Sequence, residues 1–149
     1  MNPDRRTVRI LAVLLVLVAG TGQSMAQSCD TASAYYYSVN GKYPMSSANL
    51  LAETNRFLGT VQPAKGSGYI TLRFTINCRG KMENGIEVLQ VDSNYAKTSF
   101  DKSLVDKLQL FLRTLDKWNV GTFENGTPLA YRGFLSFKIN DGKVVNIIP

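Results

Sequence analysis

Two cysteines are the residues of this chain best suited to covalent chemistry. Cys29 and Cys78 are the only cysteines among the 149 residues, and the chain has no histidine. Without histidine, Ser-His and Cys-His nucleophile pairs and imidazole metal sites are excluded. Arg79 could lower the pKa of the Cys78 thiol, but the two cysteines are too far apart for a Cys-x-x-Cys redox motif. The sequence therefore favours a non-enzymatic protein without metal or cofactor, and a small exported enzyme or redox protein using Cys78 is the alternative.

The same two cysteines could instead form a disulfide. Export usually brings a chain into an oxidising compartment, where cysteine pairing is favoured. A Cys29–Cys78 bridge would close a loop of about 50 residues and stabilise the fold by on the order of 4 kcal/mol. Two unpaired thiols are the other interpretation, and the sequence leaves both open.

Acidic residues cluster weakly around the middle of the chain. Glu83 and Glu87 have the even spacing that would place both on one face of a strand, with Asp92 nearby. Paired carboxylates can perform acid–base work, but no second pair or positioning basic residue accompanies them. Charges solvated on a strand surface are therefore the favoured interpretation.

Three residues of a late strand are candidates for contacting a partner: Arg132, Phe134 and Lys138. The guanidinium of Arg132, like that of Arg73, could bind carboxylates of a partner in a bidentate manner. Phe134 falls on the polar face of its strand, so it either contacts a partner or lies beneath the N-terminal arm. The run Tyr35-Tyr36-Tyr37 is either a binding platform or a half-buried strand, and the strand is favoured.

Residues 1–26 have the order of a secretory signal. Basic residues precede an apolar run at 10–19, and Ser24 and Ala26 fit the small positions before a cleavage site. The run of about ten residues is short for a membrane span, which takes roughly 20. We predict cleavage after Ala26 and an exported, periplasmic or secreted protein without a permanent membrane anchor. An uncleaved anchor and lipid attachment at Cys29 are the alternatives.

Composition limits the class of partner. The chain is 44% hydrophobic with a formal net charge of +6, which is typical of a globular protein with a mildly basic surface. After residue 26 the charges are interspersed, without the basic patch that nucleic-acid binding needs. We expect a protein or peptide partner in the cell envelope and no nucleic acid.

Hydrophobic periodicity predicts an α+β fold. A helix is expected at 48–58, strands at 69–77 and 86–91, the main amphipathic helix at 101–117, and strands at 129–140 and 144–148. The apolar phase slips between Val88 and Leu89, which suggests a bulge there. We predict a two-layer sandwich: a small antiparallel sheet with one main helix packed on it, plus a short N-terminal helix. The expected organisation is a signal peptide at 1–26, an arm and short helix at 27–67, and a domain at 68–149.

The predicted domain resembles the C-terminal domain of TonB, the periplasmic energy transducer. The shared order is a strand led by Gly68, a turn with Gly80, a helix opened by Asp101, Trp118 at its end, a Gly126-Thr-Pro128 loop and a last strand with Phe137-Lys-Ile139. The chain is also similar to small exported TonB-like proteins of the Bacteroidetes type. The resemblance covers residues 68–140 and implies the fold and a strand-pairing mode of peptide binding.

Two features of a full TonB transducer are missing from the sequence. The transducer has an N-terminal helix carrying a Ser and a His that engage the inner-membrane motor, and a long proline-rich spacer. This chain has no histidine and only five prolines, which are scattered. The sequence therefore predicts a binding module rather than a motor-driven transducer, with a membrane-anchored transducer-like protein as the alternative. Residues 144–149 are expected to lie over one edge of the sheet, either as a cover or as a plain last strand.

Overall fold

The computed structural model describes residues 33–59 and 65–149 of the chain. The signal-like segment and Cys29 lie outside these residues. The elements follow one another as β1 (Ser33–Tyr35), the 3-10 helix η1 (Tyr36–Ser38), α1 (Ser47–Leu58), β2 (Gly68–Ile76), β3 (Met82–Asp92), α2 (Lys102–Thr114), β4 (Gly121–Thr122), β5 (Pro128–Asn140) and β6 (Lys143–Ile148). This is an α+β fold, as the periodicity predicts.

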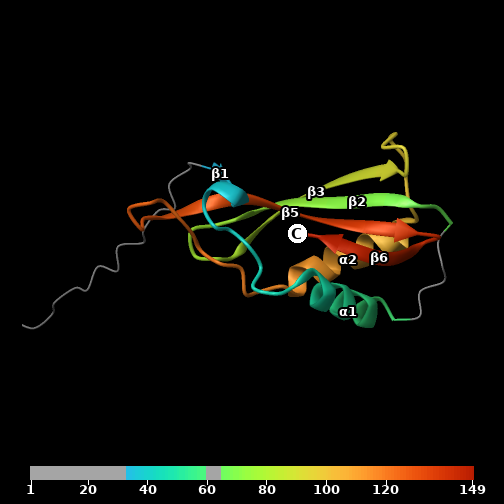
Figure 1. Cartoon of the computed structure of the whole chain (residues 1–149), viewed down its shortest axis with the longest axis horizontal. Helices are drawn as coiled ribbons and strands as arrows, with labels where there is room; N and C mark the ends of the chain where they lie inside the picture. Colours follow the sequence, from blue (N-terminus) through green and yellow to red (C-terminus); the bar gives the residue numbers. More distant parts are fainter. Residues whose placement is uncertain (1–32, 60–64) are drawn as a thin grey trace, which may run out of the picture.

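A single six-stranded sheet forms the body of the protein (Figure 1). Its main path is β1-β5-β2-β3, and β4 and β6 also pair with β5. The sheet is mixed rather than antiparallel, because β1 runs parallel to β5 with Ser33 opposite Ala130 and Tyr35 opposite Arg132. The expectation of a wholly antiparallel sheet is wrong at this one strand, since the N-terminal arm reaches the sheet from a distant part of the chain and no hairpin turn sets its direction.

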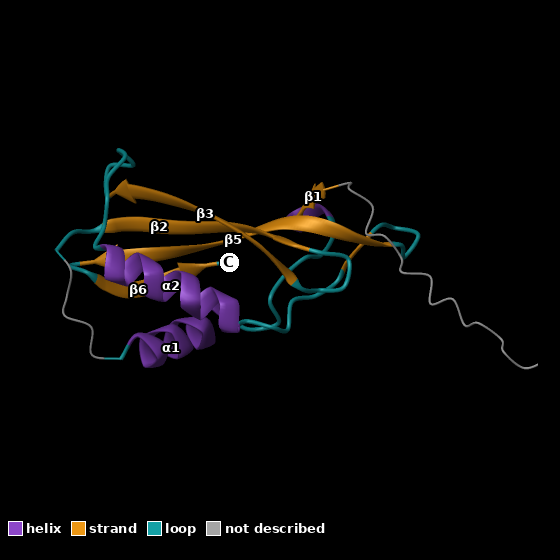
Figure 2. Cartoon of the chain, turned by 180° about the vertical axis from the view of Figure 1, so that it is seen from behind, coloured by secondary structure: helices purple, strands orange, loops and turns teal. Residues whose placement is uncertain are grey.

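The predicted alternation of β2 appears directly in its burial. Its even-numbered residues from Ile70 to Ile76 are buried, while Arg73 is exposed and the other odd-numbered residues are half-buried. In strand β5 the odd-numbered residues from Leu129 to Ile139 are buried, and so are Ala130 and Ser136. Helices α1 and α2 both lie on the side of the sheet that the buried apolar side chains face (Figure 2). In the described part of the chain, the opposite face carries neither α1 nor α2, and the short helix η1 meets it where the ring of Tyr36 packs on that of Phe134.

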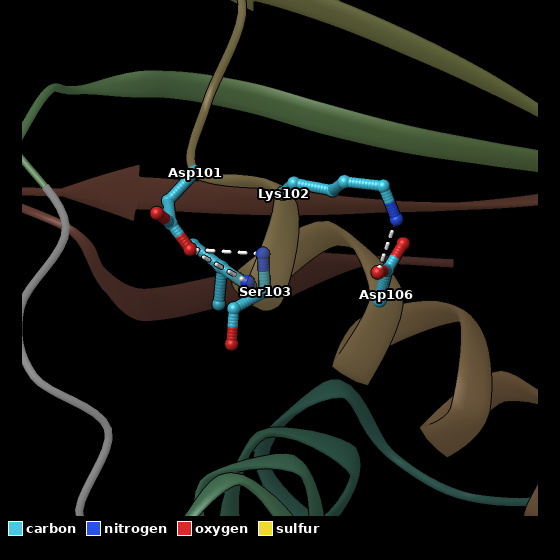
Figure 3. Close-up of polar contacts among 5 residues, drawn as sticks. Asp101, Lys102, Ser103 and Asp106 are labelled. Carbon is cyan, nitrogen blue, oxygen red and sulfur yellow. Dashed lines mark hydrogen bonds and ion pairs between the residues drawn. The ribbon is translucent and has the colours of Figure 1, made fainter.

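Helix α2 begins where the sequence predicts it. Asp101 is its N-cap: the carboxylate accepts hydrogen bonds from the backbone N–H groups of Ser103 at 2.9 Å and Leu104 at 3.3 Å (Figure 3). Lys102 and Asp106 form an exposed ion pair one turn apart. The helix ends at Thr114, three residues before the predicted end, because Leu115 takes an extended conformation. This turn in the backbone lets Leu115 and Trp118 enter the core.

Helix α1 also follows its sequence signals. The Ser46 hydroxyl caps its first turn by accepting a hydrogen bond from the N–H of Asn49 at 3.3 Å. The helix ends at Leu58, and Gly59 follows it with a φ of +59°, a conformation that residues with a Cβ rarely adopt. The helix contacts α2 and β6, and Leu50 and Leu58 are buried. The core thus extends continuously from Val39 to Ile147 and includes residues on both sides of position 67.

The bulge predicted between Val88 and Leu89 is wrong in position. Strands β2 and β3 pair without interruption from Gly68–Asp92 to Phe74–Ile86, and the irregularity lies between Phe74 and Ile76. The apparent slip in the pattern has another cause. Val88 packs against the core while Leu89, 38% exposed, lies on the face opposite α1 and α2. Neighbouring apolar residues therefore occupy opposite faces of one regular strand.

Candidate functional site

A groove of about 660 Å³ crosses the sheet where β1, β5, β2 and β3 lie side by side. We call it the tyrosine groove. Each of the four strands contributes to its lining, and η1 adds two of the three consecutive tyrosines. The lining side chains that carry its chemistry are Tyr35, Tyr36, Tyr37, Arg73, Thr75, Glu87, Arg132 and Phe134.

The three tyrosines do not share one strand, contrary to the favoured interpretation of the sequence. Strand β1 ends at Tyr35, and η1 turns the chain so that Tyr35 and Tyr37 project the same way. Their rings are stacked with centroids 5.6 Å apart, and they are 57% and 71% exposed. Tyr36 points elsewhere and packs on the core. The tyrosine run therefore presents two parallel rings to solvent and buries only the one between them.

Phe134 lies beneath the N-terminal arm, which is one of the two positions that the sequence analysis gives for it. Its ring meets that of Tyr36 edge to face, with centroids 5.4 Å apart. An edge-to-face pair places the positive edge of one ring against the negative face of the other. Because Phe134 is half-buried, the same ring still lines the groove. Phe134 thus holds the arm on the sheet and remains available to a ligand.

The two arginines of the groove differ in their partners. Arg73 pairs with Glu87 on the neighbouring strand, with 3.6 Å between the nitrogen and oxygen, and both side chains are largely exposed. An exposed pair of this kind contributes little to stability. Arg132 forms no ion pair with any residue in the described part of the chain. The groove therefore contains one guanidinium whose charge is not balanced by a described acidic neighbour.

Lys138 is separated from the other two predicted contact residues. It lies further along β5, opposite Tyr69, and lines a smaller cavity of about 210 Å³ with Gly68 and Asn140. The ring of Tyr69 stacks on that of Tyr95 at 5.6 Å. The hydrogen bond with Tyr69 raises the pKa of Tyr95 above its usual value. Of the three predicted residues, the structure brings together Arg132 and Phe134 only.

The outer edge of β3 carries backbone groups without a strand partner. The C-terminal end of this edge is covered by the loop that follows β3. The backbone carbonyl of Gln90 accepts a hydrogen bond from the N–H of Thr98 at 3.2 Å, and the backbone N–H of Asp92 donates one to the carbonyl of Ala96 at 2.8 Å. Backbone groups alternate along a strand, so the N–H and C=O of Ile86 and Val88 point to the same edge. No described residue hydrogen-bonds with them there.

The opposite edge of the sheet is occupied. Strand β5 is paired on that side by β4 at 128–129, by β1 at 130–132 and by β6 at 136–140. The segment η1 contacts β5 in addition. Residues 144–149 thus lie over the edge of β5, as expected, and β6 also places Val144 and Ile147 in the core. Among the described residues, β1 and β6 have no strand on their outer sides, and β3 is the long strand of the main path whose outer edge stays unpaired at Ile86 and Val88.

The acidic residues and Cys78 do not assemble into a reactive centre within residues 33–59 and 65–149. The carboxylate of Glu87 forms an ion pair with Arg73, and the carboxylate of Asp92 accepts hydrogen bonds from the N–H groups of Asn94 and Ala96. No group of three potential metal ligands occurs in this part of the chain. Cys78 is not a free thiol. Its proposed partner Cys29 lies outside the described residues, so that pairing stays a prediction.

Comparisons of the chain with protein-family models, with characterised proteins and with solved structures find no match. Among the described residues, no helix has the length and apolar character to cross a membrane.

Two features of the site escaped the sequence analysis. Gly85 lines the groove on β3, but the strand was expected to begin only at residue 86, so this glycine was left outside it. The convergence of the tyrosine run with Arg132 depends on the parallel pairing of β1 with β5, which joins segments almost 100 residues apart. A parallel pairing of this kind leaves no turn motif in the sequence that could have revealed it.

Proposed function

We propose that this protein is an exported, non-enzymatic binding module of the TonB C-terminal type, which holds an extended peptide along the free edge of β3. The single observation that carries the proposal is that edge: the outward backbone groups of Ile86 and Val88 are open while the edge of β5 is occupied. An extended peptide can add to such an edge as a further strand. Backbone hydrogen bonds then supply affinity, and neighbouring side chains supply selectivity.

The element order supports the assignment to this family. Strands β2 and β3 form a hairpin, α2 follows, and β5 returns beside β2, which is the strand, strand, helix, strand order that the resemblance implies. A two-layer arrangement, with helices on one face and the other face open, is the form of the fold that we propose for the family member. Its peptide site differs from an open β5 edge, because β6 pairs with that strand.

Edge strands are normally protected against unwanted pairing by charges, bulges or shortness. Strand β3 is long, with the outward positions of Ile86 and Val88 flanked by Glu83 and Glu87. These carboxylates discourage self-pairing between two copies, since equal charges would face each other. A peptide without acidic residues meets no such repulsion and can still pair with β3. This difference is the selectivity expected of a binding edge.

Export of the module is part of the proposal. The signal-like order of residues 1–26 supports cleavage after Ala26 and a protein that acts in the periplasm or outside the cell. N-terminal sequencing of the protein recovered from the envelope should begin at Gln27. An intact Met1 in the membrane fraction would instead identify the membrane-anchored alternative.

Amide exchange combined with peptide selection tests the edge. Phage-displayed random 16-residue peptides are selected on the full exported protein, and a selected peptide is added to the isotope-labelled protein. The amides of Ile86 and Val88 should exchange quickly in the free protein and slowly with the peptide bound. Those of Glu87 and Leu89, which face β2, should be protected in both states. Failure to select peptides, or binding that leaves Ile86 and Val88 fast, would overturn the proposal.

A matched pair of variants checks the same point. Val88→Pro removes the outward N–H, a substitution that edge strands tolerate better than central ones. Val88→Ala keeps this N–H while losing most of the side chain. Peptide affinity should fall with Val88→Pro and persist with Val88→Ala, provided that both variants keep a cooperative unfolding transition. Equal loss in both would assign the effect to side-chain packing and contradict strand addition.

A further inference from the structure

We infer that the tyrosine groove binds an acidic segment of the partner peptide where the peptide continues beyond the β3 edge. This inference rests on the proposed function and adds to it the chemistry of the partner. The strand-paired part of the peptide is held by backbone groups, which carry no sequence preference. The groove supplies that preference through a guanidinium and a set of aromatic rings.

The groove runs across the strands rather than along them. Glu87 of β3 is opposite Arg73 of β2, Arg73 is opposite Phe134 of β5, and the neighbouring Arg132 is opposite Tyr35 of β1. Three interstrand spacings of about 4.8 Å give a path of about 14 Å. An extended chain advances about 3.3–3.6 Å per residue, so the path accommodates about four residues. A groove of about 660 Å³ suits a segment of that size.

Gly85 connects the free edge to the groove. It lies on β3 beside the groove, and a Cβ built at this position would meet no atom within 4 Å. Its backbone is not in the left-handed region that favours glycine. The absence of a side chain therefore leaves a gap in the rim of the sheet, through which a peptide paired with Ile86 and Val88 can turn onto the face opposite α1 and α2.

Charge selects an anionic segment. Arg132 has no acidic partner among the described residues, and Arg73 shares its charge with Glu87 across 3.6 Å. The groove thus has an excess of positive charge at its inner end. A guanidinium binds a carboxylate through two parallel N–H donors, which gives both attraction and orientation. Acidic side chains of the peptide are expected at that end.

The aromatic rings receive the apolar parts of the same segment. The edge-to-face pair of Tyr36 and Phe134 is fixed by its packing, and the stacked rings of Tyr35 and Tyr37 stand beside it. Rigid rings offer contact area at a small cost in side-chain entropy. Glu83 and Glu87 disfavour acidic residues in the strand-paired part of the peptide. The expected partner sequence is therefore a strand without acidic residues followed by an acidic segment containing a ring side chain.

Selection on variants of the groove tests this inference. The same random 16-residue library is selected on the wild-type protein, Arg132→Glu, Gly85→Trp and Gly85→Ala, with Arg79→Glu as a charge control outside the groove. Wild-type selections should enrich Asp, Glu and aromatic residues at a fixed distance from the strand-pairing segment. Arg132→Glu should replace this preference by Lys and Arg at the same positions, and Arg79→Glu should leave it unchanged.

The Gly85 pair separates the groove from the edge. Tryptophan at this position fills the gap in the rim, whereas alanine adds only a methyl group in open space. Gly85→Trp should lower the affinity for an acidic-tailed peptide roughly tenfold, which is the effect of losing one charge-assisted hydrogen bond. Gly85→Ala should bind this peptide as tightly as the wild type does. A peptide of the same strand sequence with a serine tail should bind equally to both variants.

The outcomes distinguish the two proposals. Peptides that slow exchange at Ile86 and Val88 but show no acidic preference would overturn the inference about the groove and leave the edge in place. The groove inference would also be overturned, and the edge left in place, if selections on Arg132→Glu gave the same acidic preference as selections on the wild type. A library that yields no binding peptide on the wild-type protein would overturn both.

Discussion

The phenolic hydroxyl of Tyr131 donates a 2.9 Å hydrogen bond to the backbone carbonyl oxygen of Asn119. The ring of Tyr131 lies between two glycines: a Cβ on Gly41 would approach it to 2.5 Å and one on Gly121 to 2.8 Å. This arrangement joins the loop after α2 and the segment after η1 to the strand that carries Arg132. Tyr131 therefore fixes the position of the groove from the core side of the sheet.

Stability should depend on Tyr131 in alkaline solution. Burial raises the pKa of Tyr131 from 10.0 to about 12, because the neutral phenol is favoured inside the protein. A raised folded-state pKa contributes stability that is complete below pH 10 and is lost as the pH rises through about 12. The unfolding free energy of the wild type should therefore fall across this interval more steeply than that of Tyr131→Phe.

The Tyr131→Phe comparison is needed because burial also raises the pKa of Tyr43, helped by Asp116 and Glu53. At neutral pH the variant should be about 1 kcal/mol less stable, since the Asn119 carbonyl loses its donor. The difference should shrink toward pH 12. Denaturant unfolding measured from pH 8 upward would count against the assignment if the two curves stayed parallel.

The stability of the protein should depend on the buried apolar residues of α2 and little on the residues of its exposed face. Leu108 and Phe111 are buried, so Leu108→Ala or Phe111→Ala should cost about 2–5 kcal/mol of unfolding free energy. Leu110 of the same helix is 56% exposed, and Leu110→Ala should change stability by less than about 0.5 kcal/mol. Thermal or denaturant unfolding measures all three. Losses below about 1 kcal/mol at both buried positions would contradict the packing of α2.

We expect the two cysteines to be joined in the exported protein. Neither thiol should react with an alkylating reagent in the folded or unfolded state until a reductant is added, and mass spectrometry should then find both labelled. Reduction should lower the unfolding free energy by up to about 4 kcal/mol. The double variant Cys29→Ser/Cys78→Ser should match the reduced protein. Two thiols that react without reductant would refute the pairing.

Removal of residues 143–149 should harm the fold as well as open an edge. Strand β6 closes the edge of β5, but Val144 and Ile147 also belong to the core, and α1 contacts the strand. The truncated protein should lose more stability than any single core truncation and should self-associate in analytical ultracentrifugation. Deleting Pro149 alone serves as the control and should change neither property. A truncated monomer of wild-type stability would show that β6 is a removable cover.

Local patterns in the sequence predicted most elements because their signals involve neighbouring residues. The alternation around Ile70 predicted β2, the apolar spacing at 48–58 predicted α1, and Asp101 predicted the start of α2. The end of α2 was predicted three residues too late, since Leu115 and Trp118 continue the apolar spacing of a helix. They reach the core from an extended segment, which periodicity alone does not distinguish.

The candidate site depended on contacts that no local pattern records. The sequence by itself determined that Arg132 and Phe134 point away from the core and that residues 144–149 return to the sheet, because side-chain direction alternates along a strand. Only the tertiary structure decided that β1 pairs in parallel with β5, that Tyr36 packs on Phe134 and that β3 keeps a free edge. Pairing between distant segments is set by which edges remain open once the core is packed, a property of the assembled sheet and not of any strand alone.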